Sequence, residues 1–139
     1  MGYYESYKAV FDQIEAVISG LANISQIVTG RRFRVQSLPL AIINPRETRI
    51  SQAEIGDMLQ NEIEFDVILI VRETEPTDWF AEVLDPLGDV VDAILADRTL
   101  NGTVKDVIPT LFSPGEVTFQ NRLYYGGLAR FSALMFYAP

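Results

Sequence analysis

The feature that most constrains the fold is a strict two-residue alternation across residues 62–72. Large apolar side chains occupy every second position of this stretch, namely Ile63, Phe65, Val67, Leu69 and Val71. Three acids lie among the residues between them. Period-two alternation over this length is typical of a β-strand with one buried face. The chain is therefore expected to build a sheet around this strand.

Other stretches also have the character of strands. Residues 38–43 are a short apolar run that ends before Asn44-Pro45, and they predict a buried strand. Residues 104–112 predict a strand that Pro109 restricts to a sheet edge or a bulge. Residues 117–119 and then 123–137 complete the set, and the last of these stretches becomes apolar on both faces. Within it, Gly126-Gly127 predicts a kink or tight turn.

Two segments show helical periodicity. Residues 4–21 repeat apolar side chains at helical spacing, and Gly20 marks the expected end. Asp85-Pro86 predicts the start of a second helix, because Asp caps free amides and Pro fits the first helical position. That helix is expected over residues 85–97, after a shorter turn through Trp79 and Phe80.

A long polar stretch, residues 44–61, separates the first two strands and predicts a long loop, either a functional arm or an extended hairpin tip. No repeat or linker divides the 139 residues, so a single domain over 1–139 is expected. Strands joined only by a loop pair antiparallel. The predicted fold is α+β, a mostly antiparallel sheet with two main helices packed on one face.

The amino-acid composition excludes several classes of function. The chain has no Cys and no His, which excludes Ser-His-Asp and Cys-His relays and the usual zinc sites. An enzyme would have to use carboxylates, and Glu62, Glu64 and Asp66 could chelate a divalent cation or simply form the solvent face of a strand. We expect no enzyme activity and no cofactor. No apolar run reaches bilayer length and the N-terminus lacks a signal pattern, so we expect a soluble, non-secreted protein without membrane contact.

Charge is unevenly distributed along the chain. The net charge of −8 argues against a generic nucleic-acid binder. Residues 31–49 nevertheless carry five arginines and a single acid, whereas residues 73–97 carry eight acids and no Lys or Arg. The interface candidates drawn from these two regions are Arg31, Arg32, Arg34, Arg46, Arg49, Glu73, Glu75, Asp78 and Glu82. They form either two solvated faces or complementary surfaces for another copy or a partner.

Tyrosines offer a further interface candidate. Five of them lie near the two ends of the chain, at Tyr3, Tyr4, Tyr124, Tyr125 and Tyr137. They are either interface aromatics gathered by the fold or isolated surface residues.

The segment ILADRTLNGTVKDV at residues 94–107 carries a resemblance to a known family. The pattern of Leu95, Asp97, Thr99, Leu100, Gly102, Val104, Asp106 and Val107 follows a helix and precedes a strand, a turn and a final strand. This order resembles the tail-completion or tail-terminator proteins of tailed bacterial and archaeal viruses. The matching pattern covers about the last 55 residues, and chain length agrees as well.

The resemblance implies a non-enzymatic virion protein. Such a protein forms a ring, typically a hexamer, at the head-proximal end of the tail tube, where it contacts the tail tube protein and a neck or head-completion protein. It would be found in the virion, and in the host cytoplasm during assembly. The arginines would then either meet the acids of the next copy or face the lumen through which DNA passes. A head-closure, connector or minor tail protein remains the alternative, followed by a carboxylate-metal enzyme.

Overall fold

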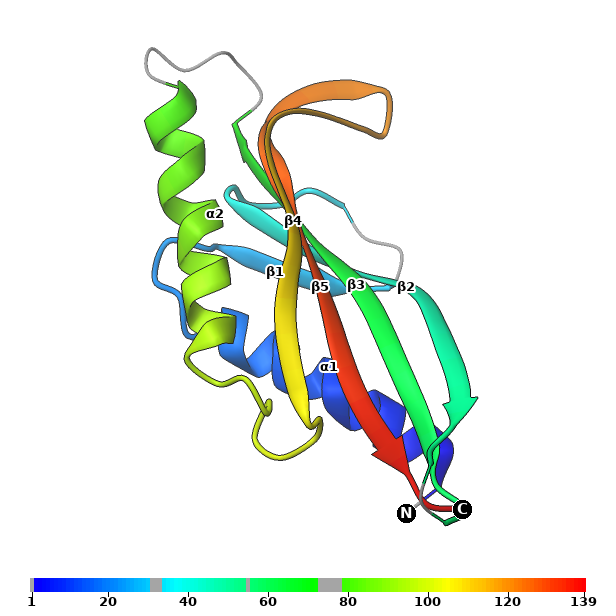
Figure 1. Cartoon of the computed structure of the whole chain (residues 1–139). Helices are drawn as coiled ribbons and strands as arrows, with labels where there is room; N and C mark the ends of the chain where they lie inside the picture. Colours follow the sequence, from blue (N-terminus) through cyan, green and yellow to red (C-terminus); the bar gives the residue numbers. More distant parts are fainter. Residues whose placement is uncertain (1, 31–33, 55, 73–78) are drawn as a thin grey trace.

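The computed structural model describes residues 2–30, 34–54, 56–72 and 79–139. Two helices and five strands follow one another along this part of the chain (Figure 1), namely α1 (Tyr3–Ser19), β1 (Gln26–Thr29), β2 (Leu40–Gln52), β3 (Leu59–Arg72), α2 (Trp79–Leu95), β4 (Asp106–Phe119) and β5 (Arg122–Tyr137). The strands form one sheet in the order β1-β2-β3-β5-β4. Only β1 and β2 pair parallel. The predicted α+β class and mostly antiparallel sheet are confirmed.

Both helices pack on the face of the sheet predicted to be buried. Ile63 and Phe65 of β3 are fully buried in a cluster with Ile14 of α1 and Leu87 of α2. The rings of Phe65 and Phe131 stack at 5.2 Å in the middle of this core. The alternation read from residues 62–72 therefore assigns the helix-covered face correctly.

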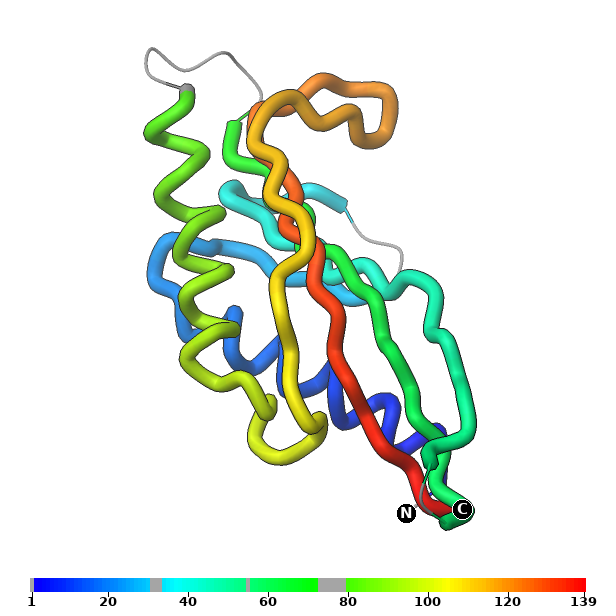
Figure 2. Tube along the Cα trace, viewed as in Figure 1, coloured from blue at the N-terminus to red at the C-terminus, as the bar shows by residue number. Residues whose placement is uncertain are grey.

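Within the described residues, the opposite face of the sheet is covered at one end. There Leu40, Ile42 and Ile70 form a second cluster with Tyr124. The outer end of the β4–β5 hairpin bends out of the plane of the sheet (Figure 2) and brings Tyr124 into this cluster. The rest of this open face carries the charged residues described below.

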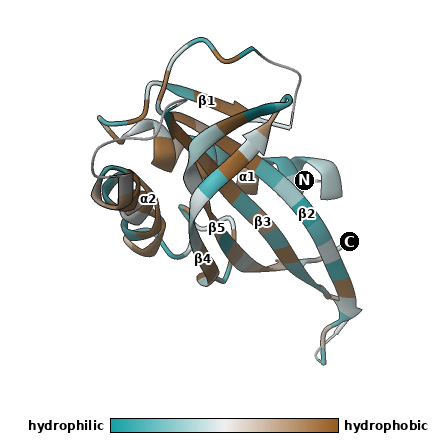
Figure 3. Cartoon of the chain, turned by 90° about the horizontal axis from the view of Figure 1, so that it is seen from above, coloured by the Kyte–Doolittle hydropathy of each residue, from teal (hydrophilic) through white to brown (hydrophobic). Residues whose placement is uncertain are grey.

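The long loop predicted for residues 44–61 is wrong in extent. Strand β2 runs on to Gln52 and β3 starts at Leu59, and the Ala53 amide donates to the Met58 carbonyl at 2.9 Å. The extended-hairpin alternative describes this segment better. Its composition is polar because β1 pairs only with Leu40–Ile43, so the outer half of β2 has a single neighbour and is exposed. Figure 3 shows this half as mainly hydrophilic.

Two other elements differ from the prediction in their bounds. Helix α2 begins at Trp79 and contains Pro86 in its interior, because Val83 and Leu87 on either side are fully buried against the sheet. Residues 104–112 and 117–119 belong to one strand, and the irregularity at Pro109 is confirmed on this edge strand.

Of the two alternatives predicted for Gly126-Gly127, the tight turn is wrong, because both residues pair inside β5. The kink agrees with the register shift between the Gly126–Ile70 and Tyr125–Arg72 pairs. The chain reverses at Gln120-Asn121, where both residues have positive φ angles of 51° and 62°. Positive φ at both central residues is the geometry of a two-residue hairpin turn.

Candidate interaction surfaces

The interface candidates fall on two sides of the molecule. Arg31, Arg32, Glu73, Glu75 and Asp78 lie outside the described residues. Among the others, three arginines belong to β2 or to the segment before it, namely Arg34, Arg46 and Arg49, and Glu82 belongs to α2. Helix α2 packs on β4 and β5, and β3 separates these strands from β2. The outer half of β2, with Arg46 and Arg49, and helix α2, with Glu82, therefore lie toward opposite sides of the sheet (Figure 1).

Arg46 is not a freely available cation. Its Nε donates to Glu64 at 2.7 Å, and one terminal nitrogen donates to Asp66 at 3.3 Å. Asp66 also accepts from Nε of Arg130 at 2.8 Å. The four side chains form one ion-pair cluster across β2, β3 and β5 on the open face. The basic surface predicted from Arg46 is thus largely neutralised within the chain.

Hydrogen bonds within this cluster shift the pKa values of Glu64, Arg46 and Arg130. The hydrogen bond from Arg46 holds the pKa of the Glu64 carboxyl below its ordinary value of 4.5. The same bond raises the pKa of Arg46, and the bond to Asp66 raises the pKa of Arg130. Glu64, Arg46 and Arg130 are therefore charged at neutral pH.

The carboxylate row of β3 contributes to this cluster. Glu64 and Asp66 each bind a guanidinium, whereas Glu62 lies opposite Arg49 of β2. In the described part of the chain, no group of three Asp or Glu side chains is arranged to hold a metal ion. The geometry of the row fits a charged seam that ties three strands together.

Helix α2 presents a strip of acids to solvent. Four exposed carboxylates follow one another at spacings of three, four and three residues, namely Glu82, Asp85, Asp89 and Asp92. Such spacing places them on one face of the helix. Glu82 forms an ion pair with Arg72 at 3.1 Å, and Asp89 accepts from Asn23 at 2.9 Å. We call this set the acidic strip.

Two of the five predicted interface tyrosines meet, together with Tyr7. The Tyr3 ring lies edge-on to Tyr137 at 5.2 Å and stacks near Tyr7 at 6.2 Å. Tyr4 is 70% exposed, while Tyr124 is buried in the second cluster. The termini thus lie at the same end of the sheet (Figure 2).

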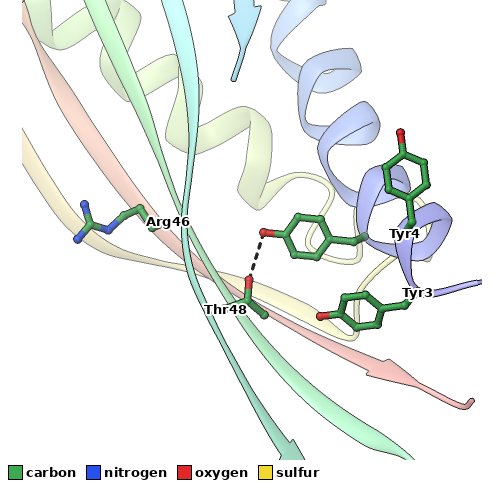
Figure 4. A pocket seen from close by; sticks show the side chains of 5 residues that line it. Tyr3, Tyr4, Arg46 and Thr48 are labelled. Atoms are coloured by element: carbon green, nitrogen blue, oxygen red, sulfur yellow. Dashed lines mark hydrogen bonds between the residues drawn. The ribbon is translucent and has the colours of Figure 1, made fainter. Parts of the chain in front are cut away.

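A shallow hollow of about 460 Å³ opens beside these rings, lined by Tyr3, Tyr4, Tyr7, Arg46 and Thr48. The Tyr7 and Thr48 hydroxyls are hydrogen-bonded at 3.1 Å, and the dashed line at Thr48 in Figure 4 marks this bond. Burial raises the pKa of Tyr3, whose hydroxyl donates to Asn61 at 2.7 Å. These polar contacts attach the first turn of α1 to the β2–β3 hairpin.

Sequence reasoning missed two residues that organise these surfaces. Asn61 is fully buried, where it accepts from Tyr3 and donates to the Met135 carbonyl at 3.3 Å. Arg130 is the partner of Asp66. The sequence contains a signal that could have identified Arg130. It is the single basic residue within the apolar stretch 128–137, and it faces a strand that contains acids.

Comparison with known proteins leaves the chain without an assigned family: no protein-family model matches it, and no curated protein does so at a significant level. Among the described residues, neither helix combines the length and apolar character that crossing a membrane requires.

Proposed function

We propose that this chain is a structural virion protein, a tail terminator that forms a ring at the head-proximal end of a viral tail tube and joins the tail to the neck. It acts by assembly and not by catalysis, without a cofactor. Its partners are further copies of itself, typically six in a ring, the tail tube protein and a neck protein. The proposal is supported by the resemblance of residues 94–107 and by an α+β fold that agrees with the one the resemblance implies.

The resembling segment consists of residues with structural roles. Leu100 and Val107 are fully buried, and Val104 nearly so. Asn101 and Gly102 have positive φ angles, and the Asn101 amide donates to Asp97 at 3.1 Å. The pattern therefore encodes a compact connection between α2 and β4, as expected of a scaffold motif and not of a catalytic one.

The observation that best supports a ring is the placement of charge. A closed ring needs a heterologous contact, in which one surface of each subunit meets a different surface of the next. Helix α2, which carries the acidic strip, packs on β4 and β5, whereas exposed Arg49 lies on the outer half of β2 at the other side of the sheet. Opposite charges on opposite sides favour head-to-tail contact over like-to-like pairing.

A charge swap tests this arrangement. Replacing Asp85 and Asp89 by Lys should weaken rings of the full chain, because it reverses the charge of the α2 side and leaves the arginines of β2 unchanged. Glu116→Lys, an exposed acid on the outer half of β4, is the matched control and should leave assembly unchanged. Light scattering gives the mass of the assembly, and negative-stain microscopy shows whether it is a closed ring.

Location in the virion tests the function itself. Labelled protein should appear as a ring at the tail end next to the head. A position inside the head portal would favour a head-closure or connector role instead. Normal rings in the Asp85/Asp89 variant, combined with failure to retain DNA in an Arg34→Glu variant, would assign the arginines to the lumen.

A further inference from the structure

The sheet has two edges that are open in the described chain. Strand β4 is the last strand of the sheet, so one of its sides has no neighbouring strand there. Strand β2 is covered by β1 only along Leu40–Ile43, which leaves its outer half open as well. Unpaired strand edges expose rows of backbone donors and acceptors that can pair with another chain.

Proline restricts where such pairing can occur. Each of the two edge strands contains a proline, and Pro45 and Pro109 lie in the same row of paired residues across the sheet. Pro45 pairs with Phe65, Phe65 with Phe131, and Phe131 with Pro109, so the two prolines end one row across the sheet. A register shift follows each of them. Proline and bulges blunt an edge, because they remove donors and bend the strand.

On one side of the Pro45–Pro109 row, both edges are regular and contain no proline. These segments are Thr48–Gln52 of β2 and Asp106–Ile108 of β4. Each carries an exposed isoleucine, Ile50 at 53% and Ile108 at 46%. Exposed apolar side chains on an unpaired edge are typical of a surface that another chain covers.

The backbone of β2 is oriented for such a contact. The Ala53–Met58 hydrogen bond closes the hairpin, and bonded pairs alternate along an antiparallel ladder. Ser51 and Arg49 therefore exchange hydrogen bonds with β3. It follows that the amides and carbonyls of Ile50 and of its alternating neighbours face the open edge.

We propose that a second copy of this chain covers these edges, with residues 48–50 of one copy lying antiparallel beside residues 105–107 of the next. The inference rests on the ring proposed above and specifies its contact. Three antiparallel pairings separate β2 from β4, so the two strands run in opposite directions. A copy placed alongside in the same orientation thus continues the sheet with the correct antiparallel alternation.

Charge supports an unshifted arrangement. Arg49 pairs with Glu62, Glu62 with Leu134, and Leu134 with Asp106, so Arg49 and Asp106 end a second row across the sheet. The next copy would bring its Arg49 directly beside Asp106, where opposite charges stabilise cross-strand pairs. Asp106 already binds Arg98 with two contacts of 2.8 Å. A carboxylate can accept from two guanidinium groups, as Asp66 does in this molecule.

Disulfide trapping tests the contact, because the natural chain has no cysteine. The full-length Arg49→Cys/Asp106→Cys variant should form covalent species larger than dimers under mild oxidation. Each single variant, as matched control, can form only dimers. Closed rings of the wild-type chain together with an uncrosslinked double variant would overturn the edge contact and leave the ring in place.

Two further outcomes would also contradict the proposed edge contact. Efficient dimer formation by the single Asp106→Cys variant would indicate two-fold pairing of β4 with itself. A wild-type chain that stays monomeric by light scattering would overturn both this contact and the ring.

Hydrogen exchange provides a test without any substitution. The Thr48 and Ile50 amides should exchange about tenfold more slowly in the assembly than in the diluted monomer, as expected when each gains a hydrogen bond. Arg49 and Ser51, whose amides pair with β3, are the internal control and should change little. Equal exchange of the Thr48 and Ile50 amides in both states would overturn the proposal.

Discussion

Two glycine-to-alanine substitutions should change stability in opposite directions. A Cβ atom at Gly126 would lie 1.8 Å from the Leu69 carbonyl oxygen and 2.8 Å from its carbonyl carbon. Both are backbone atoms of β3, so β3 and β5 must move apart to accept Gly126→Ala. At Gly88, in the middle of α2, a Cβ would meet no heavy atom within 4 Å.

The magnitudes follow from these contacts. Overpacking costs about 1–3 kcal/mol, and replacing glycine returns about 0.4–1 kcal/mol by restricting the unfolded chain. Gly126→Ala should therefore lower the free energy of unfolding by about 1–2 kcal/mol. Gly88→Ala should raise it by about 0.5–1 kcal/mol, because alanine is the better helix former. For a domain of this size, 1 kcal/mol corresponds to about 3 °C in Tm.

Thermal and urea denaturation followed by circular dichroism measure both effects. The two variants control for each other, because both replace glycine by alanine and only the surroundings of the substituted residue differ. A Gly126→Ala protein as stable as the wild type would contradict the close approach of β5 to β3. A Gly88→Ala protein that is less stable would show that the exposed side of α2 is covered in solution.

Three further predictions concern the hairpin and the open face. Asn61→Ala should lower the free energy of unfolding by about 2–3 kcal/mol, because the Tyr3 hydroxyl and the Met135 carbonyl lose a buried partner; urea denaturation measures this loss. The depressed pKa of Glu64 contributes stability above pH 4.5 that is lost as pH falls through the folded-state pKa, so an Arg46→Met protein should lose less stability on acidification in pH-dependent denaturation. Replacing residues 52–59 by Asn-Gly should leave the circular dichroism spectrum unchanged, since Ser51–Gln60 is a bonded pair that suits a two-residue turn, but should prevent tail joining in an assembly assay.

The elements with one buried face could be predicted from the sequence. The alternation in residues 62–72 indicates both the strand and its buried side, since Ile63 through Leu69 at odd positions are fully buried. The first helix was predicted to within two residues. The sequence predicts these segments because each packs against one neighbour, the apolar core, which determines the spacing of its apolar residues.

Elements whose surroundings are unusual could not be predicted in this way. The outer half of β2 is exposed on both faces, so nothing in its composition separates it from a loop. Pro86 is a helix-start signal that burial of its neighbours overrides. The Arg46–Asp66–Arg130 contacts join three strands distant in sequence, and only the register of the sheet brings them together.

The Asp66 ion pairs also restrict the register in which β3 pairs with β5. Apolar alternation fixes which face of β3 is buried but tolerates a slip of two residues along β5. Asp66, which is only 2% exposed, would then face Ser132 or Leu128 in place of Arg130. The slip would leave this buried carboxylate with Arg46 alone, at 3.3 Å, and would remove the closer Arg130 contact at 2.8 Å. Because a buried carboxylate that loses its closer cation is costly, the Asp66–Arg130 pair selects one register even where it adds little net stability. The same register aligns Arg49 with Asp106 and Pro45 with Pro109 at the two edges. The charged cluster thereby determines which edge segments a neighbouring copy can meet.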